Sequence, residues 1–372
     1  MERNMERMIA TLNTLDTLNT VDTNTKLFFT DWEGPWITTD FALEISNRIL
    51  GNQRFFERLS QYDDYLYYIK KMKDYYAGDT LKLLAPFIAA HDVNSSKLEK
   101  LAKETANYVP DAEKAISILQ EKFKPVVIST SYIQYLETTA KKIGVEGYLY
   151  GTEFDVERFS SIFNEKDRLE AENIVEKISK MPEIRIDVEN RRVISGFETI
   201  SFLDGIFWGE SGFTRKVQEI MKEIEVIGGK RKLEIVKRYS SATKNLIAIG
   251  DSISDFEMLG WVKGKGLAVS FNGNEYSLMR SNLAIISDSA FSEAAVIESF
   301  ILLGLDGVKR LIDLYTSMKE KEKIYELIDE RIADGLMNSK TIFQWIDGDY
   351  LSILADSLRM RKTLRGEAGK LG

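Results

Sequence analysis

The sequence predicts an α/β protein whose core is a doubly wound parallel sheet, with a helical cap and a helical C-terminal extension. Strand–helix–strand alternation over 111–151, and again over 231–287, predicts the parallel sheet. Two apolar runs end abruptly on carboxylates, Asp31 and Asp251. Because unpaired buried charge is costly, these two strand ends are expected to meet at one site with a cation or a phosphate.

The first predicted strand spans 27–31. Thr38, Thr39 or Asp40 can cap a helix that begins near Phe41, and apolar residues recur at helical spacing from there to residue 109. The elements predicted next, in chain order, are a helix at 111–122, a strand at 125–129, a helix at 132–143 and a strand at 147–151.

Residues 155–228 interrupt this alternation with mixed, charged sequence. The elements predicted after them are a helix at 231–239, a strand at 245–250, a helix from 255, and strands at 266–271 and 283–287. Residues 291–372 have the pattern of helices throughout.

These elements divide the chain into a core with two insertions and an extension. The predicted units are a flexible leader (1–25), an α/β core (26–40, 110–154 and 229–290), a helical cap (41–109), a second insertion of unassigned role (155–228) and a helical C-terminal extension (291–372).

Composition excludes several classes of site. The 372 residues include no cysteine, which excludes disulfides, thiolate catalysis and zinc–sulfur sites, and one histidine, His91, which we interpret as structural. The net charge of −8 argues against nucleic acid as the main partner, and we interpret the basic tail at 359–370 as a solvated helix end. Without a long apolar segment or a signal-peptide pattern, the protein is expected to be soluble and cytoplasmic, with no membrane partner.

Polar residues follow three of the predicted strands, where an open parallel sheet binds its ligands. They are Asp31 and Glu33, then Ser129, Thr130 and Ser131, and finally Asp251, Ser252 and Asp255. Three carboxylates with no competing thiolate or imidazole favour Mg²⁺. The Ser-Thr-Ser run is a candidate phosphate cradle or a plain helix cap, and Ser254 with Glu257 has capping-box spacing.

A lysine near the start of the helix at 231–239 can reach the same crevice. Lys232 precedes an apolar face by one helical turn, and Lys230, just after two glycines, is the competing candidate. The alternative for either residue is a solvated surface charge.

Taken in order, four motifs resemble the haloacid dehalogenase (HAD) superfamily, and most of all its phosphoserine-phosphatase-like branch with a helical cap. The motifs are Asp31-Trp32-Glu33, Val127-Ile128-Ser129, Lys232-Leu-Glu-Ile-Val, and Gly250-Asp251-Ser252-Ile253-Ser254-Asp255. The resemblance implies a HAD-like core and a Mg²⁺-dependent phosphohydrolase that acts on a small phosphorylated metabolite.

The resemblance also implies roles for individual residues. Asp31 would be the nucleophile that forms an aspartyl-phosphate, and Glu33 would protonate the leaving oxygen and later activate water. The implied phosphate ligands are Ser129, Thr130 and Lys232. The implied Mg²⁺ ligands are Asp31, Glu33 through its backbone carbonyl, Asp251 and Asp255.

Two residues depart from the family pattern. Glu33 stands where the family has a second aspartate, and Pro35 stands where it has threonine or valine. Glutamate keeps the acid–base chemistry but reaches about 1.5 Å further, and a misplacement of about 1 Å can cost about a hundredfold in rate. The alternative function is therefore a weakly active or non-catalytic binding or assembly protein, with a protein partner at the C-terminal helices.

Overall fold

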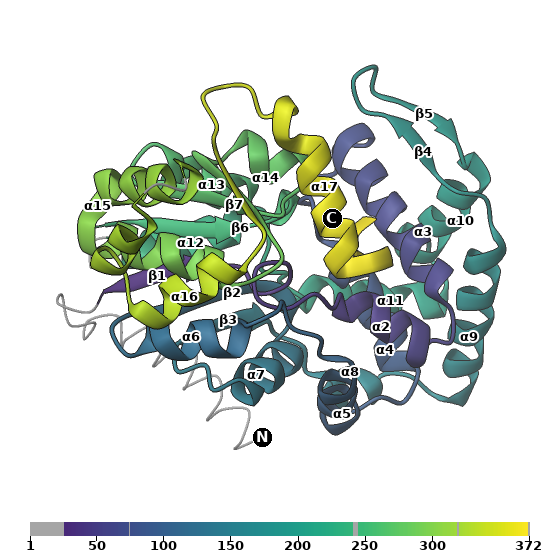
Figure 1. The fold of residues 1–372 in the computed structure, drawn as a ribbon. Coiled ribbons are helices and arrows are strands. Elements are labelled where there is room, and N and C mark those ends of the chain that lie inside the picture. Colours follow the sequence, from purple (N-terminus) through teal and green to yellow (C-terminus); the bar gives the residue numbers. More distant parts are fainter. Residues whose placement is uncertain (1–25, 74, 241–244, 318–319, 371–372) are drawn as a thin grey trace.

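The computed structural model describes residues 26–73, 75–240, 245–317 and 320–370, and the predicted leader lies outside them. Its centre is a seven-stranded sheet in the order β3-β2-β1-β6-β7-β8-β9 (Figure 1). The strands are β1 (Leu27–Thr30), β2 (Lys124–Tyr132), β3 (Tyr148–Thr152), β6 (Ile247–Gly250), β7 (Leu267–Phe271), β8 (Leu283–Ser287) and β9 (Thr341–Trp345).

Six of these strands are parallel, and the seventh, β9, was not predicted from the sequence. β9 pairs antiparallel with β8, from Leu283 opposite Trp345 to Ser287 opposite Thr341. The prediction that residues 291–372 are helical throughout is therefore wrong at this strand. The strands predicted from the alternation are confirmed to within about three residues at their ends, and the α/β fold class is confirmed.

Helices cover both faces of the sheet, as a doubly wound topology requires. Alternate residues of β1 point to opposite faces: Phe28 belongs to one apolar cluster, and Leu27 and Phe29 to another. One face packs on α6 (Ala112–Gln120), α7 (Ile133–Lys142) and α15 (Phe291–Ser317), which is interrupted at Gly304. The other packs on α12 (Gly229–Tyr239) and α13 (Phe256–Lys263).

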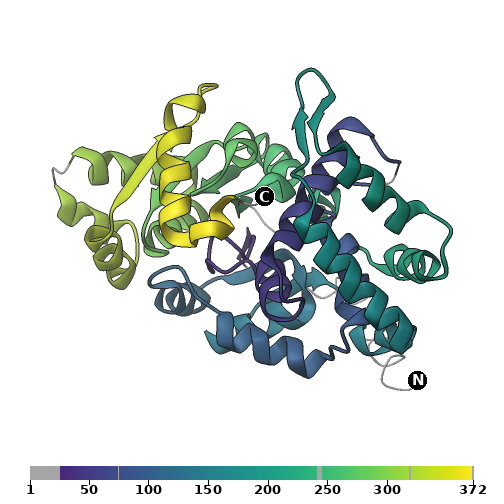
Figure 2. The same cartoon turned by 90° about the vertical axis from the view of Figure 1, so that its right-hand side faces the viewer.

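The two insertions pack against each other beside the sheet. The first forms α2 (Phe41–Arg48), α3 (Gln53–Asp64), the π-helical turn η2 (Tyr65–Ile69), α4 (Thr80–Ala90) and α5 (Ser95–Thr105). The second forms α8 (Val156–Ser160), α9 (Glu165–Lys180), α10 (Phe197–Trp208), α11 (Gly212–Glu223) and the hairpin β4–β5 (Arg185–Asp187, Arg192–Ser195). Contacts of α3 with α9, and of α4 with α8, α9 and α11, join them into one helical body (Figures 1 and 2).

Local hydrogen bonds mark the start of α2 and the end of α4. The Asp40 side chain caps α2 by accepting from the Leu43 backbone N–H at 2.9 Å, as the sequence predicts. His91 lies at the C-terminal end of α4, with its Nδ1 2.7 Å from the Phe87 carbonyl oxygen, which agrees with a structural role.

The C-terminal extension returns to the sheet and then to the boundary with the cap. After α15 come η4 (Lys321–Glu326), α16 (Glu330–Asn338), β9, α17 (Leu351–Arg365) and η5 (Gly366–Lys370). In Figure 1 the yellow α17 lies between the sheet and the helical body formed by the two insertions. Within the described residues, no helix combines the length and apolar character that crossing a membrane requires.

Candidate active site

Asp31 lies at the carboxyl end of β1, and the loop after it is fixed by buried hydrogen bonds. Its backbone N–H donates to the Ile249 carbonyl of β6 at 2.9 Å, which ties the two central strands together at the site. The Trp32 N–H donates to Asp31 Oδ1 at 2.7 Å, and the Trp32 indole donates to Thr139 Oγ1 at 2.8 Å. The nucleophile predicted from the sequence is therefore held in one orientation.

Lys232, on α12, lies between two carboxylates. Its Nζ is 2.8 Å from Asp31 Oδ2 and 2.8 Å from Asp255 Oδ1, and its side chain is fully buried. Lys230 is exposed. Of the two candidate lysines, Lys232 is thus the one that lies in the cluster.

Asp251 and Asp255 follow β6 and complete an acidic cluster with Asp31. One carboxylate oxygen from each of the three residues lies within 4.8 Å of the others, and all three side chains are buried. Asp255 Oδ2 also accepts from the backbone N–H groups of Asp251 at 3.0 Å and Ser252 at 3.1 Å. The capping box here joins Ser252 and Asp255, two residues earlier than the predicted Ser254–Glu257 pair.

Gly34 makes the close approach of the first loop to Asp251 possible. Its φ is +112°, and a Cβ at this position would lie 2.2 Å from Asp251 Oδ2. A residue with a side chain would be strained by this backbone and would also overlap the carboxylate.

The charges within the cluster perturb one another. Burial raises the pKa of Asp31 to about 8; the Asp255 charge adds to this and Lys232 opposes it. Burial disfavours the Lys232 ammonium, but Asp255 and Asp31 outweigh it and raise the pKa of that lysine. A dication would stabilise the ionised form of Asp31 in the same way.

The donor set of the cluster fits a hard cation. Asp31, Asp251 and Asp255 offer carboxylate oxygens only, and the sequence has no cysteine that would select a softer metal. The buried Asp31–Asp251–Asp255 cluster could therefore bind a divalent metal.

Ser129, Thr130 and Ser131 lie near the end of β2 and line the same cavity as Asp31. The Ser129 hydroxyl accepts from the Ser131 N–H at 3.2 Å. Thr130 Oγ1 is buried and has no hydrogen-bond partner among the described residues. A buried hydroxyl without a partner is rare in folded proteins, so this group is free to donate to a ligand.

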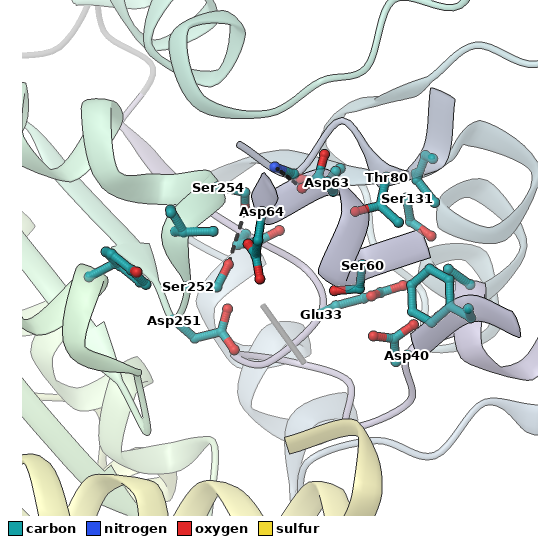
Figure 3. A pocket seen from close by; sticks show the side chains of 18 of the residues that line it. Glu33, Asp40, Ser60, Asp63, Asp64, Thr80, Ser131, Asp251, Ser252 and Ser254 are labelled. Atoms are coloured by element: carbon teal, nitrogen blue, oxygen red, sulfur yellow. Dashed lines mark hydrogen bonds between the residues drawn. The ribbon is translucent and has the colours of Figure 1, made fainter. Parts of the chain in front are cut away.

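Glu33 lines the cavity opposite Asp251 and beside Asp40 (Figure 3). Burial raises the pKa of Glu33 to about 8, and the nearby Asp40 charge adds to the effect against the opposing charge of Arg365. The free protein therefore holds Glu33 largely protonated at neutral pH, in the form that can donate a proton.

The cavity, of about 330 Å³, is bounded by sheet, cap and C-terminal helix. Asp251, Ser252 and Ser254 come from the sheet side, and Ser60, Asp63 and Asp64 from α3 (Figure 3). Ile186 and Val188 of the β4–β5 hairpin also line it, so the second insertion contributes to the site.

Two arginines of α17 reach the cluster, a position that was not predicted from the sequence. Arg361 Nη1 contacts Asp251 Oδ2, and Arg365 Nη1 lies 2.8 Å from the same oxygen. Their side chains are 2% and 7% exposed. The interpretation of 359–370 as a solvated helix end is thus wrong for these two residues, although Arg359 and Lys362 are exposed. Their i, i+4 spacing on one helix face was the available signal.

The sequence matches no protein-family model and no curated protein. Among solved structures it is similar to gene product AF1437 from Archaeoglobus fulgidus, with 39% sequence identity over 94% of this chain and 99% of that chain and a TM-score of 0.77.

Two other solved structures overlap with part of the chain. One is a phosphoserine phosphatase with an analogue of its phospho-aspartyl intermediate, 13% identical over 70% of this chain and 93% of that chain, with a TM-score of 0.41. The other is a HAD family hydrolase from Salmonella enterica, 12% identical over 67% of this chain and 63% of that chain, with a TM-score of 0.40.

The resemblance recognised from four motifs agrees with the strand order and with the meeting of Asp31, Lys232, Asp251 and Asp255 at the carboxyl ends of the central strands. With 39% identity over nearly the whole of both chains and a shared α/β fold, the protein belongs to the same family as the archaeal gene product AF1437.

Proposed function

We propose that this protein is a Mg²⁺-dependent phosphohydrolase that acts on a small phosphorylated metabolite through an aspartyl-phosphate on Asp31. The observation that carries the proposal is the buried cluster of Asp31, Asp251 and Asp255 with the Lys232 ammonium 2.8 Å from two of its members. A hydrolase of this kind needs a carboxylate nucleophile, a metal site and a fixed cation within one cavity.

In the first step, an Asp31 carboxylate oxygen attacks phosphorus and the bond from phosphorus to the ester oxygen breaks. Glu33 gives its proton to the departing oxygen, so the alcohol leaves neutral. Its raised pKa, about 8, supports this role, because the proton is present at neutral pH. Lys232, Ser129 and Thr130 bind the phosphoryl oxygens, where negative charge is greatest in the transition state.

In the second step, the now ionised Glu33 takes a proton from water, and the resulting hydroxide attacks phosphorus. The bond between phosphorus and Asp31 breaks, which releases phosphate and restores the aspartate. When bound by Asp31, Asp251, Asp255 and the backbone of residue 33, Mg²⁺ supplies positive charge that offsets the phosphoryl oxygens.

The cap supplies substrate selection and water exclusion in this proposal. Ser60, Asp63 and Asp64 of α3 and the apolar Ile186 and Val188 of the hairpin line the part of the cavity away from Asp31. A small ester would be enclosed between these residues and the sheet.

The test is hydrolysis of p-nitrophenyl phosphate with Mg²⁺, comparing the wild type with Asp31→Asn. Asp306→Asn is the matched control, because Asp306 is exposed on α15 and does not line the cavity. We expect loss of activity in Asp31→Asn and on chelation of the metal, and retained activity in Asp306→Asn. Equal rates for the wild type and Asp31→Asn would refute the proposal.

The second candidate is a weakly active or non-catalytic binding protein on the same fold. Glu33 in place of aspartate favours it, as does the engagement of Asp251 by two arginines. It predicts Mg²⁺-dependent capture of beryllium fluoride, measured by calorimetry, without turnover of any ester. A protein partner at the C-terminal helices belongs to this candidate.

A further inference from the structure

Helix α17 is docked onto the sheet by one buried face. Ile353, Ser357 and Arg361 recur every four residues and are all buried. Ile353 packs in an apolar cluster with Ala284 and Ile286 of β8, and the Ser357 hydroxyl donates to the Gly273 carbonyl at 2.7 Å. Arg361 and Arg365, which follow Ser357 by one and two helical turns, are therefore held in fixed positions.

Both arginines contact Asp251. Arg361 donates to Asp251 Oδ2 and, at 3.2 Å, to the Asp251 backbone carbonyl, while Arg365 donates to Asp251 Oδ2 at 2.8 Å. Each guanidinium also has a backbone partner: Arg361 Nε donates to Gly369 at 3.1 Å, and Arg365 Nε donates to Thr38 at 3.3 Å. Arg365 thus connects the Asp251 loop with the loop that follows Asp31.

The two arginines balance the charge of the cluster. Asp31 and Asp255 share the ammonium of Lys232, and Asp251 has the guanidinium groups of Arg361 and Arg365. Three carboxylates therefore contact three cations. With all three carboxylates ionised, these six groups carry no net charge. A dication alone then gains little, because the added charge is opposed by three fixed positive groups.

We propose that Arg361 and Arg365 are positioning residues that make the binding of Mg²⁺ and of a phosphate dianion mutually dependent. The inference rests on the proposed function, since it assigns the metal to this cluster. The dication raises the charge of the constellation by two, and the dianion restores it to zero. Both arginines line the cavity that the phosphate would enter, so their charge opposes the metal alone and favours the pair.

This coupling is reciprocal. If phosphate raises the affinity for Mg²⁺ by some factor, Mg²⁺ must raise the affinity for phosphate by the same factor. Mg²⁺ and phosphate also attract each other directly, so the role of the arginines is measured by the change in the coupling factor when their charges are removed. A helix that only supports the fold would leave that factor unchanged.

The experiment is calorimetric titration of Mg²⁺ into the full chain, with and without saturating inorganic phosphate. For the wild type we expect weak binding without phosphate and binding tighter by about tenfold or more with it. For the double variant Arg361→Gln, Arg365→Gln we expect Mg²⁺ alone to bind about tenfold tighter than in the wild type, and the phosphate effect to shrink correspondingly.

Two control variants isolate charge from packing. The double variant Arg361→Lys, Arg365→Lys keeps both positive charges and is expected to restore wild-type coupling. Arg359→Gln removes an exposed arginine of the same helix and is expected to change nothing. Circular dichroism verifies that each variant is folded before titration.

The outcomes distinguish this inference from the proposed function. Mg²⁺ binding that is unchanged or weaker in the glutamine double variant, with that variant folded, overturns the role of the arginines but leaves the metal site intact. Absence of Mg²⁺ binding in every variant, with and without phosphate, overturns the metal site itself and therefore both proposals.

Discussion

The Lys232 ammonium lies 2.8 Å from a carboxylate oxygen of Asp31, and both side chains are buried. Asp255 is at the same distance on another side of that ammonium. A single lysine thus pairs with two acids that are 224 residues apart in the chain. Removing one partner of a buried ion pair costs far more than an exposed pair contributes, because the remaining charge stays desolvated.

We therefore expect Lys232→Met to lower the free energy of unfolding by about 3–5 kcal/mol. Mg²⁺ should stabilise this variant more than it stabilises the wild type, because the metal then supplies the missing positive charge. Urea unfolding with and without Mg²⁺ measures both effects. Lys230→Met is the matched control and should leave stability unchanged, since Lys230 is exposed. Equal stability of Lys232→Met and the wild type would contradict the argument.

Replacing Glu33 by glutamine should slow the hydrolysis of esters with poor leaving groups more than that of esters with good ones. An alkoxide needs a proton as it departs, whereas p-nitrophenolate does not, so we expect Glu33→Gln to slow alkyl phosphate hydrolysis by about 10²–10⁴-fold. With p-nitrophenyl phosphate the variant should release a rapid burst of p-nitrophenolate and then turn over slowly, because water activation is also lost. Stopped-flow absorbance measures the burst. A first step slowed by the same factor for both esters would argue against Glu33 as the acid.

A methyl group at residue 34 should damage the metal site. In Gly34→Ala the new Cβ would lie 2.2 Å from Asp251 Oδ2 on a backbone with φ of +112°. We expect a loss of about 1–3 kcal/mol in stability and displacement of the Asp251 carboxylate, with weaker Mg²⁺ binding by calorimetry.

The control for this variant is Gly51→Ala. Gly51 has a φ of +72°, and a Cβ added there would meet no atom of the described residues within 4 Å, so the substitution adds strain without a clash. It should cost about 1–2 kcal/mol and leave Mg²⁺ affinity unchanged. If both variants bind Mg²⁺ as the wild type does, the close approach of the loop is unimportant for the metal.

Glu293, on α15, should make stability fall as the pH rises. Its side chain is buried, neither carboxyl oxygen has a hydrogen-bond partner among the described residues, and burial raises its pKa well above 4.5. The folded protein therefore holds a proton that the unfolded chain releases above about pH 4.5, and folding costs more at each higher pH up to the folded pKa.

Glu293→Gln should consequently stabilise the protein at pH 7 by about 1–3 kcal/mol and flatten the dependence of stability on pH between about 5 and 7. Thermal unfolding across this range measures it. Glu298→Gln is the contrasting variant, because Glu298 is equally buried but pairs with Lys122 at 2.8 Å and accepts from the Asp329 N–H at 2.7 Å. Glu298→Gln should destabilise the protein, and a stabilising effect of this substitution would contradict the prediction.

The sequence was sufficient for the six parallel strands of the sheet and for the acidic cluster, because both leave strong local signals. β1 and β6 are short apolar runs that end on Asp31 and Asp251, and parallel strands bring such ends together whatever lies between them. The choice between Lys230 and Lys232 needed the structure, because both residues lie within one turn of the start of α12.

Other features leave no comparable local signal. β9 has five residues between two helices, and its pairing with β8 depends on a partner more than 50 residues away. The buried face of α17 is formed by Ile353, Ser357 and Arg361. Because two of these three residues are polar, the sequence lacks the apolar periodicity that predicts a buried helix face. Long-range contacts of this kind also unite α3 with α9 across the two insertions.

The antiparallel pairing of β9 with β8 has a geometric consequence for the other end of α17. The ladder fixes the point from which the helix starts. Arg361 follows Leu351 by ten steps along the helix, which advance it by about 15 Å, and each step turns the helix by about 100°. The number of residues in this segment therefore sets both how far the arginines lie from the start of the helix and the direction in which they point. Inserting or deleting one residue within it would swing both guanidinium groups away from Asp251 even though every residue type were retained.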